Sequence, residues 1–337
     1  MPLTVGIAGF GFMGKMHFNI YSRHRDAQVT HVCSRRGTGL LKEQGPAVGN
    51  IDSGSEQETD LSGVQLVETF EELCAADVDI IDICVPTFLH AEYGVKSLEA
   101  GKHTFLEKPM GMDPQEADSI IEAWDRSNAV LQVGQCLRFW PEYDLLKRTV
   151  DSGEYGEVRA ASFMRLSPFP DWSADSWIKD GSKSGGAALD LHIHDTDFVN
   201  YLFGRPRSVR SFGTGMITDS IDYISTCYNY GRGMTVTAQG GWMGMPGFPF
   251  RMEFTVMFER VSMEFSSRGI DIYTKEGDHL EQELTSGNGW EHEIDYFLTC
   301  ISEGADSVIV TPSSAREAVE IVCAEIESVQ SGREIAV

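Results

Sequence analysis

The chain has 337 residues, a formal net charge of −24 at pH 7 and a hydrophobic content of 42%. This length exceeds that of one typical hydrophobic core and indicates two domains. The acidic charge disfavours nucleic acids and anionic membranes as partners, because both attract a basic surface, and no stretch approaches the roughly 18 consecutive apolar residues of a membrane span.

The first predicted strand, Leu3–Ala8, runs directly into a glycine-rich turn with the sequence G-F-G-F-M-G, and a helix is predicted over Gly14–Arg23. In a strand–turn–helix frame, three glycines at this spacing permit a tight turn, close approach of a pyrophosphate and close helix–strand packing. The free N–H groups of the helix N-terminus then attract phosphate. The turn therefore predicts a dinucleotide site. The expected contacts are Gly9, Phe10, Gly11, Phe12, Met13 and Gly14.

The second predicted strand, Val29–Cys33, ends at Ser34, Arg35 and Arg36, about where an acidic residue would bind the ribose of NAD. No carboxylate stands there to repel a 2′-phosphate, and guanidinium groups bind phosphate well. The sequence therefore favours NADP over NAD. The alternative is that Arg35 and Arg36 are solvated loop charges.

The next predicted strand, Ile80–Val85, is followed by Pro86, Thr87 and His90, and then by a helix over Ala91–Glu99. Ligands of doubly wound sheets gather beyond the carboxyl ends of the strands. We expect this loop to contact the cofactor, with Thr87 near its nicotinamide half. His90 is interpreted as a helix-start residue rather than a catalyst.

A further predicted strand, Thr104–Leu106, leads into Glu107, Lys108 and Pro109. A lysine at the carboxyl end of a strand lies where substrate meets cofactor in such sheets. The sequence suggests a cis peptide bond between Lys108 and Pro109, because cis bonds are almost confined to proline. The alternative is an exposed loop lysine.

A helix from Asp113 through Trp124 and a strand over Val130–Val133 complete the alternating pattern. Alternation of strands and helices predicts a parallel sheet covered on both faces. We therefore expect an α/β Rossmann dinucleotide-binding domain over residues 1–130.

The pattern changes after about Arg138, where segments alternate polar and apolar residues. This periodicity predicts strands that have one buried face. The expected strands are Val158–Leu166, Val209–Gly213, Tyr223–Tyr230, Met234–Gln239, Met252–Glu259 and Val261–Ser266. With helices near Glu291–Glu303 and Ser313–Ser331, we expect residues 131–337 to form an α+β domain built on a large, mostly antiparallel open sheet.

The segment Ser184–Asp197 reads S-G-G-A-A-L-D-L-H-I-H-D-T-D. If it is helical, Asp190, His194 and Asp197 share one face, and His192 points nearly opposite to His194. Since the two histidines do not face a common point, we expect no metal site there. The alternative to a functional site is a polar surface cluster.

The glycine turn, the E-K-P at Glu107–Pro109 and the segment Gly185–Asp195 together resemble the Gfo/Idh/MocA oxidoreductases. The resemblance implies a catalytic set of Lys108, Asp190 and His194, and assembly as a homodimer or homotetramer through the antiparallel sheet. His194 suits the role of base because its ordinary pKa lies near neutral pH. Lys108 suits stabilisation of alkoxide charge, and Asp190 suits orientation of a hydroxyl group or the imidazole.

Other residues shape the expected substrate site, and each has a structural alternative. Arg138 either borders the substrate or has a structural role between the domains. Trp172 and Trp177 either stack against a sugar ring or pack in the core. His192 either adds a polar group to the pocket or faces the sheet. The expected substrate contacts are Lys108, Arg138, Trp172, Asp190 and His194.

These residues predict an NAD(P)-dependent oxidoreductase that transfers hydride between nicotinamide and a carbohydrate-like hydroxy compound. Two alternatives remain: a glycoside hydrolase that recycles a tightly bound NAD, and a dinucleotide-binding regulator without turnover. Seven widely spaced cysteines form neither a disulfide framework nor a structural zinc motif. This cysteine pattern favours a reduced, cytoplasmic setting. Because no basic leader precedes the first strand, we expect no signal peptide.

Overall fold

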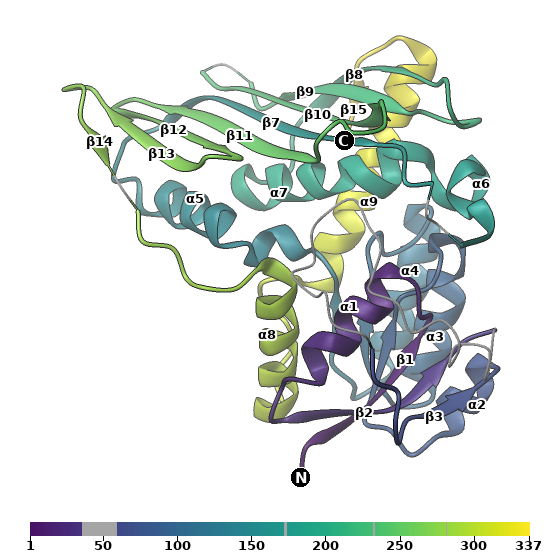
Figure 1. Cartoon of the computed structure of the whole chain (residues 1–337). Helices are drawn as coiled ribbons and strands as arrows, with labels where there is room; N and C mark the ends of the chain where they lie inside the picture. The colour runs from purple at the N-terminus through teal and green to yellow at the C-terminus, as the bar shows by residue number, and fades with distance from the viewer. Residues whose placement is uncertain (36–58, 172–173, 232, 281) are drawn as a thin grey trace. The chain divides into compact units, whose positions relative to one another are not determined.

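The computed structural model describes residues 1–35, 59–171, 174–231, 233–280 and 282–337 (Figure 1). These residues form two compact units. Unit 1 comprises Met1–Gln135, Trp172–Trp177 and Trp290–Arg316. Unit 2 comprises Cys136–Asp171, Ile178–Gly289 and Glu317–Val337.

A six-stranded sheet forms the centre of unit 1, in the order β3-β2-β1-β4-β5-β6. Its strands are β1 (Leu3–Ala8), β2 (Ala27–Cys33), β3 (Gln65–Val67), β4 (Ile80–Ile83), β5 (His103–Leu106) and β6 (Leu131–Val133). Every pairing is parallel. All residues of β4 and β6 are buried, as both-face coverage requires. This topology confirms the predicted Rossmann sheet.

The helices of this sheet follow local start signals. They are α1 (Phe12–Tyr21), α2 (Phe70–Ala75), α3 (His90–Glu99) and α4 (Pro114–Asp125), with a 3-10 turn, η2, over Thr87–Leu89. The Asp113 side chain accepts the Glu116 N–H at 2.9 Å, and Pro114 occupies the first turn of α4. Helix α1 begins at Phe12, two residues before the predicted start, because Gly11 is its N-cap. Short elements β3 and α2 were not predicted.

Helix α8 (Gly289–Glu303) contributes to the core of unit 1, although it is far from the sheet in sequence. Ile294, Phe297 and Leu298 are buried among residues of the Rossmann core. The Phe297 ring meets Phe105 of β5 edge-on at 5.5 Å. Residues 290–316 thus belong to unit 1, whereas the expected division at 130/131 assigns them to the second domain. The apolar face of α8 packs against a sheet whose strands lie far from α8 in the sequence.

Unit 2 contains a nine-stranded sheet in the order β14-β13-β12-β11-β7-β10-β9-β8-β15. The strands are β7 (Val158–Pro168), β8 (Ser208–Thr214), β9 (Tyr223–Asn229), β10 (Thr235–Gly244), β11 (Arg251–Phe258), β12 (Val261–Ser266), β13 (Gly269–Thr274), β14 (His279–Leu280) and β15 (Ile335–Ala336). Only β7 and β10 pair in parallel; the other adjacent strands are antiparallel. The predicted mostly antiparallel sheet is confirmed.

One face of this sheet is covered by α5 (Pro141–Ser152) and α7 (Ile193–Phe203) (Figure 1). The buried Tyr143 ring of α5 lies 4.8 Å from Phe198 of α7 and 5.2 Å from Phe254 of β11. Ile321 of α9 (Pro312–Ser331) joins the same core. Side chains alternate between this core and the opposite face, as a one-sided sheet requires.

Four short segments complete the described structure: η3 (Cys136–Phe139), η4 (Ala174–Lys179), α6 (Gly181–Ser184) and the π-helix η5 (Ala188–His192). No helix within the described ranges combines the length and apolar character needed to cross a membrane.

Candidate active site

The glycine turn after β1 is shaped by close backbone contacts. Gly9 has a φ of +89°, and a Cβ there would lie 2.4 Å from the Cys84 carbonyl oxygen. A Cβ on Gly14 would lie 2.1 Å from the Gly9 oxygen. Gly11 differs, because a Cβ there would meet nothing within 4 Å. The first and third glycines are therefore required by packing, and the second leaves open space beside the backbone.

The N-terminus of α1 lies in this turn, where Gly11 is the N-cap and no side chain caps the helix. Strand β1 lies between β2 and β4, at the point where the strand order of the sheet reverses. Helix N-termini at such points attract phosphate. The open space beside Gly11 and the backbone N–H groups at the start of α1 thus fit a dinucleotide pyrophosphate. Phe10, Phe12 and Met13 of the turn are partly buried, and the Phe10 ring meets Phe18 edge-on at 5.6 Å.

Ser34 and Arg35 follow the carboxyl end of β2. The Ser34 N–H donates to the Val67 carbonyl at 3.1 Å, and Arg35 is exposed. Neither residue is acidic, so this end of β2 presents no carboxylate to a 2′-phosphate. Arg36 lies outside the described residues.

The loop after β4 holds Pro86, Thr87 and His90. Thr87 is buried, and so is His90 at the start of α3. The ring nitrogens of His90 face two carbonyl oxygens, with Nδ1 2.6 Å from Pro109 and Nε2 2.9 Å from Val85. Burial lowers the pKa of His90. His90 therefore links the loops after β4 and β5, which agrees with its interpretation as a helix-start residue rather than a catalyst.

The loop after β5 carries Glu107, Lys108 and Pro109. The Lys108–Pro109 peptide is cis, as the sequence suggested. Lys108 is partly buried, and its backbone N–H donates to the Glu107 Oε2 atom at 3.1 Å. The Glu107 side chain is 7% exposed, and its Oε1 atom lies 3.3 Å from the His17 Nε2 atom. The Glu107 carboxylate thus faces buried groups of unit 1, which favours a structural role over the expected cofactor contact.

Sequence reasoning missed the buried polar cluster around His17. The His17 Nδ1 atom lies 2.9 Å from the Asp82 Oδ2 atom, and the Cys84 thiol donates to Asp82 at 3.1 Å. Burial works to lower the pKa of His17, but the neighbouring Asp82 and Cys84 raise it well above its usual range. Burial, and then the charge of Glu107, raise the pKa of Glu293 well above its usual range. The available sequence signal was a histidine, His17, within the helix predicted directly after the glycine turn.

In unit 2, the segment Ala188–Phe203 presents two polar side chains that are only partly buried, Asp190 and His194. Asp190 lies on the π-helix η5, and His194 lies in the first turn of α7. Asp197 is fully buried. The expectation that all three share one face is corrected, because the π turn takes more residues than an α turn and shifts the phase of the helix.

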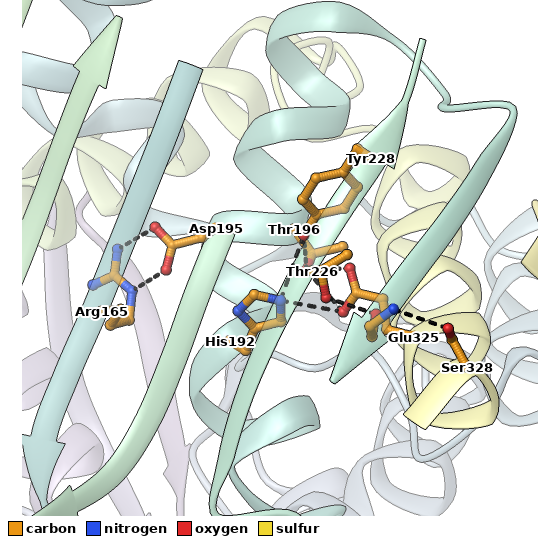
Figure 2. A network of polar contacts seen from close by, with 9 residues as sticks. Arg165, His192, Asp195, Thr196, Thr226, Tyr228, Glu325 and Ser328 are labelled. Atoms are coloured by element: carbon orange, nitrogen blue, oxygen red, sulfur yellow. Dashed lines mark hydrogen bonds and ion pairs between the residues drawn. The ribbon is translucent and has the colours of Figure 1, made fainter. Parts of the chain in front are cut away.

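Buried neighbours hold this segment in place, and Figure 2 shows most of them. Arg165 donates to Asp195, with 2.9 Å between Nε and Oδ2. The Thr196 hydroxyl donates to Glu325 at 3.1 Å and lies 3.0 Å from the Tyr228 hydroxyl. These contacts anchor the buried side of α7 to β7, β9 and α9.

His192 belongs to the same network and faces the sheet, which decides between the two roles left open for it. Its Nε2 atom lies 3.3 Å from the Glu325 Oε2 atom (Figure 2). A Cβ on Gly240 of β10 would come 2.7 Å from the His192 Cβ atom. Gly240 therefore gives His192 the space to pack against the sheet.

Arg138 also holds the fold of unit 2. Its side chain is 1% exposed and donates to Asp197 at 2.6 and 2.9 Å. Its guanidinium carbon lies 4.7 Å from the centre of the Tyr201 ring. This geometry favours a structural role over the expected substrate contact, and the contacts that give it lie within unit 2. Trp172 lies outside the described residues, and Trp177 of η4 is partly buried.

The sequence matches two protein-family descriptions. Residues 3–135 match "Oxidoreductase family, NAD-binding Rossmann fold", and residues 143–264 match "GFO/IDH/MocA C-terminal domain". The two matches follow the order of the parallel and antiparallel sheets.

Individual proteins also resemble the chain. Inositol 2-dehydrogenase of Rhizobium meliloti is 26% identical over 352 aligned positions, covering 100% of both chains. Levoglucosan dehydrogenase of Pseudarthrobacter phenanthrenivorans is 30% identical over 222, covering 62% of this chain and 53% of its own. A solved levoglucosan dehydrogenase in complex with NADH and levoglucosan has a TM-score of 0.85 at 20% identity, with 100% of both chains covered. At that identity, the structural likeness supports the fold.

Proposed function

Because the chain belongs to the Gfo/Idh/MocA oxidoreductases, we propose that it transfers hydride between a nicotinamide dinucleotide and a hydroxyl-bearing carbon of a sugar, polyol or related compound. One observation carries the proposal. Within unit 1, Lys108 follows the carboxyl end of β5, and the glycine turn follows the carboxyl end of β1. Strand β4 lies between these two parallel strands. A cation there suits a reacting oxygen beside a cofactor.

The chain supplies binding and orientation for this cofactor. The glycine turn and the N-terminus of α1 would hold its pyrophosphate, and the loops after β4 and β5 border its nicotinamide end. When bound, the nicotinamide accepts or returns the hydride. The relatives of this chain include an inositol dehydrogenase and a levoglucosan dehydrogenase, which supports a carbohydrate-like substrate.

Three side chains carry the proposed proton and charge chemistry. The His194 imidazole removes the hydroxyl proton during oxidation and returns it during reduction. The Lys108 ammonium group binds the reacting oxygen and stabilises its developing negative charge. Asp190 orients the substrate hydroxyl or the imidazole. The partial exposure of all three leaves them accessible to a ligand, in contrast to the buried Asp195 and Asp197.

A nicotinamide absorbance assay tests this function directly. Purified protein is mixed with NAD or NADP and a panel of inositols, anhydrosugars, glucosides and sugar acids. We expect turnover with one class, and a loss of about 10²–10⁴-fold in Lys108→Ala. Lys96→Ala, which removes an exposed lysine of α3, is the control. Absence of turnover with retained dinucleotide would favour the cofactor-recycling hydrolase, and absence with exchangeable dinucleotide would favour the regulator.

We further propose that NADP is preferred over NAD. The exposed Arg35 and the lack of an acidic side chain at Ser34–Arg35 support this choice. Arg35→Ala should weaken binding of NADPH but leave binding of NADH nearly unchanged, measured by nicotinamide fluorescence. Arg25→Ala, which precedes the opposite end of β2 and pairs with Asp26, is the matched control. Equal losses for both dinucleotides would contradict the preference.

The open face of the nine-stranded sheet supports a homodimer or homotetramer. Met257 and Tyr273 lie across β11, β12 and β13 in one register line, and both are exposed, as is Phe212 of β8. Exposed apolar side chains on a sheet face are typical of an interface. Light scattering should give two or four times the chain mass, and a monomer mass would contradict this proposal.

A further inference from the structure

The buried cluster of unit 1 has no assigned part in the proposed reaction. Its members come from four separate elements: His17 from α1, Asp82 from β4, Glu107 from the loop after β5 and Glu293 from α8. The side chains of His17 and Asp82 have no exposed surface, and Glu293 is fully buried. These four groups, with the Cys84 thiol beside His17 and Asp82, require an explanation, because buried charges are unfavourable unless they are paired.

The contacts run in one line from Asp82 to Lys108. Asp82 lies 2.9 Å from the Nδ1 atom of His17, and Glu107 lies 3.3 Å from its Nε2 atom. The other oxygen of Glu107 accepts the Lys108 backbone N–H at 3.1 Å. The Glu107 carboxylate thus approaches His17 with one oxygen, at ion-pair distance and without hydrogen-bond geometry, and accepts from the Lys108 backbone with the other.

The position of Glu107 is also confined from its other sides. Its backbone N–H donates to the Ile83 carbonyl of β4 at 3.0 Å. A Cβ on Gly134, after β6, would lie 3.2 Å from the Glu107 Oε1 atom. Gly134 therefore leaves just enough space for the carboxylate. The close fit gives Glu107 one place to lie, which is what a positioning group requires.

His17 connects this loop with the cofactor turn. It lies on α1, whose N-terminus is formed by the glycine turn. A helix is a rigid element over this short length, so the spacing between the turn and His17 is fixed. The ring of His17 is held in turn by Asp82 and meets Phe105 edge-on at 5.3 Å.

We propose that His17 and Glu107 are a positioning pair, which fixes the Lys108 backbone relative to the glycine turn that would hold the cofactor. The inference rests on the proposed function, in which Lys108 binds the reacting oxygen. The pKa of His17, which burial lowers and the neighbouring Asp82 and Cys84 raise well above its usual range, favours an imidazolium beside Asp82. The Glu107 Oε1 atom lies 3.3 Å from the other ring nitrogen. Burial and then Glu107 raise the pKa of Glu293, which favours its neutral form beside the pair.

The alternative to an imidazolium in this cluster is a bound metal ion. Ligand atoms of His17, Glu107 and Glu293 lie within 4.8 Å of one another. The His17 Nε2 atom, the Glu107 Oε1 atom and both Glu293 oxygens have no hydrogen-bond partner among the described residues. A metal would need the Nε2 atom of His17 without its proton. Metal analysis of the purified protein therefore separates the two occupants: a stoichiometric metal that is lost in Glu293→Gln would overturn the imidazolium pair.

The decisive experiment measures the rate at which the Lys108 backbone amide exchanges its hydrogen with solvent. Protein labelled with ¹⁵N-lysine gives a Lys108 amide signal, which is assigned by its absence in Lys108→Arg. We expect exchange of this amide with solvent to be about tenfold faster in His17→Gln and in Glu107→Gln, because its acceptor is displaced or weakened. His24→Gln is the matched control, since the His24–Asp295 pair joins the turn after α1 to α8 but is less buried, with side chains 21% and 70% exposed. Unchanged exchange in both test variants would overturn the proposal.

Kinetics with the substrate found in the absorbance assay provide the second readout. Both test variants should lower kcat by about 10–100-fold through misplacement of Lys108, while the dissociation constant for the dinucleotide changes less than about threefold. The double variant should be no slower than Glu107→Gln, because His17 acts through Glu107. If Lys108→Ala retains turnover, the proposed function fails. If Lys108→Ala loses turnover but both test variants retain it, only the positioning pair fails.

Discussion

In unit 2, each buried aspartate of α7 faces one arginine, Asp195 with Arg165 and Asp197 with Arg138. In unit 1, the single imidazole of His17 faces both Asp82 and Glu107, with the carboxyl group of Glu293 beside them. An arginine keeps its charge at every pH at which a protein folds, whereas histidine and buried carboxyl groups exchange protons. The buried pairs that support the catalytic segment of unit 2 therefore carry fixed charges. The buried cluster of unit 1 can instead gain or lose protons.

The two regions should therefore respond differently to substitution. Removing one member of a fixed pair leaves a buried charge without compensation at neutral pH. Removing one member of the cluster around His17 changes the number of protons that the cluster binds. The remaining groups can then change their own protonation and reduce the uncompensated charge. Mutations in unit 2 should therefore act on stability most strongly, and mutations in the cluster of unit 1 should depend on pH.

The largest effect is expected for Arg138→Met. Asp197 would lose its partner while it remains buried, which should lower the free energy of unfolding by about 3–5 kcal/mol. Urea denaturation measures this change. Arg148→Met, which breaks the exposed pair with Asp144 on α5, should have little effect.

The pH dependence of the same variant sharpens the comparison. Burial raises the pKa of Asp197, and Arg138 opposes that increase. Without Arg138 the folded-state pKa rises further above the unfolded value, so stability is present at low pH and is lost as pH rises. The deficit of Arg138→Met should thus be smaller at pH 5 than at pH 8. The double variant Arg138→Met/Asp197→Leu should recover most of the stability, and a deficit equal to that of the single variant would contradict a charge effect.

The second largest effect concerns the backbone of the glycine turn. A Cβ on Gly14 would lie 2.1 Å from the Gly9 carbonyl oxygen, whereas a Cβ on Gly11 would meet nothing within 4 Å. Gly14→Ala should therefore lower the free energy of unfolding by about 1–3 kcal/mol through overpacking. Gly11→Ala should leave stability nearly unchanged but weaken dinucleotide binding, because the methyl group occupies the space of the pyrophosphate. Thermal unfolding with and without dinucleotide measures both, and equal destabilisation by the two substitutions would contradict the geometry.

The sequence predicted those parts of the molecule that depend on local pattern. Apolar runs located five strands of the Rossmann sheet, and Asp113 with Pro114 located the start of α4. The glycine spacing located the turn at the carboxyl end of β1. Two short elements of unit 1, β3 and α2, were missed because three to six residues carry too little periodicity. In unit 2, α5, β13, β14 and β15 were also not predicted.

The parts that were missed depend on distant contacts. Glu293 reads as a polar residue of an amphipathic helix, and only the packing of α8 in unit 1 brings it beside Glu107. Arg138 was expected beside substrate, but its partner Asp197 lies 59 positions away. The π turn at Ala188–His192 leaves no signature in residue types, so the phase of Asp190 and His194 relative to Asp197 was not predictable.

The smallest effect is expected for Glu293→Gln, and it tests whether the cluster of unit 1 depends on protons. The folded-state pKa of Glu293 is raised by burial and by Glu107. The folded protein therefore binds a proton that the unfolded chain releases near its ordinary pKa of about 4.3, and the associated stability is lost as pH rises above that value. Glutamine keeps the neutral shape and has no proton to lose.

The variant should therefore match the wild type near pH 4.5 and unfold at a higher temperature near pH 8.5, by about 2–4 °C for each 1 kcal/mol recovered. Glu303→Gln, an exposed position at the end of the same helix, controls for the change in net charge. A temperature difference that is the same at both pH values would mean that Glu293 does not take up a proton on folding. The cluster would then carry a fixed charge, as the pairs of unit 2 do, and the contrast between the two units would disappear.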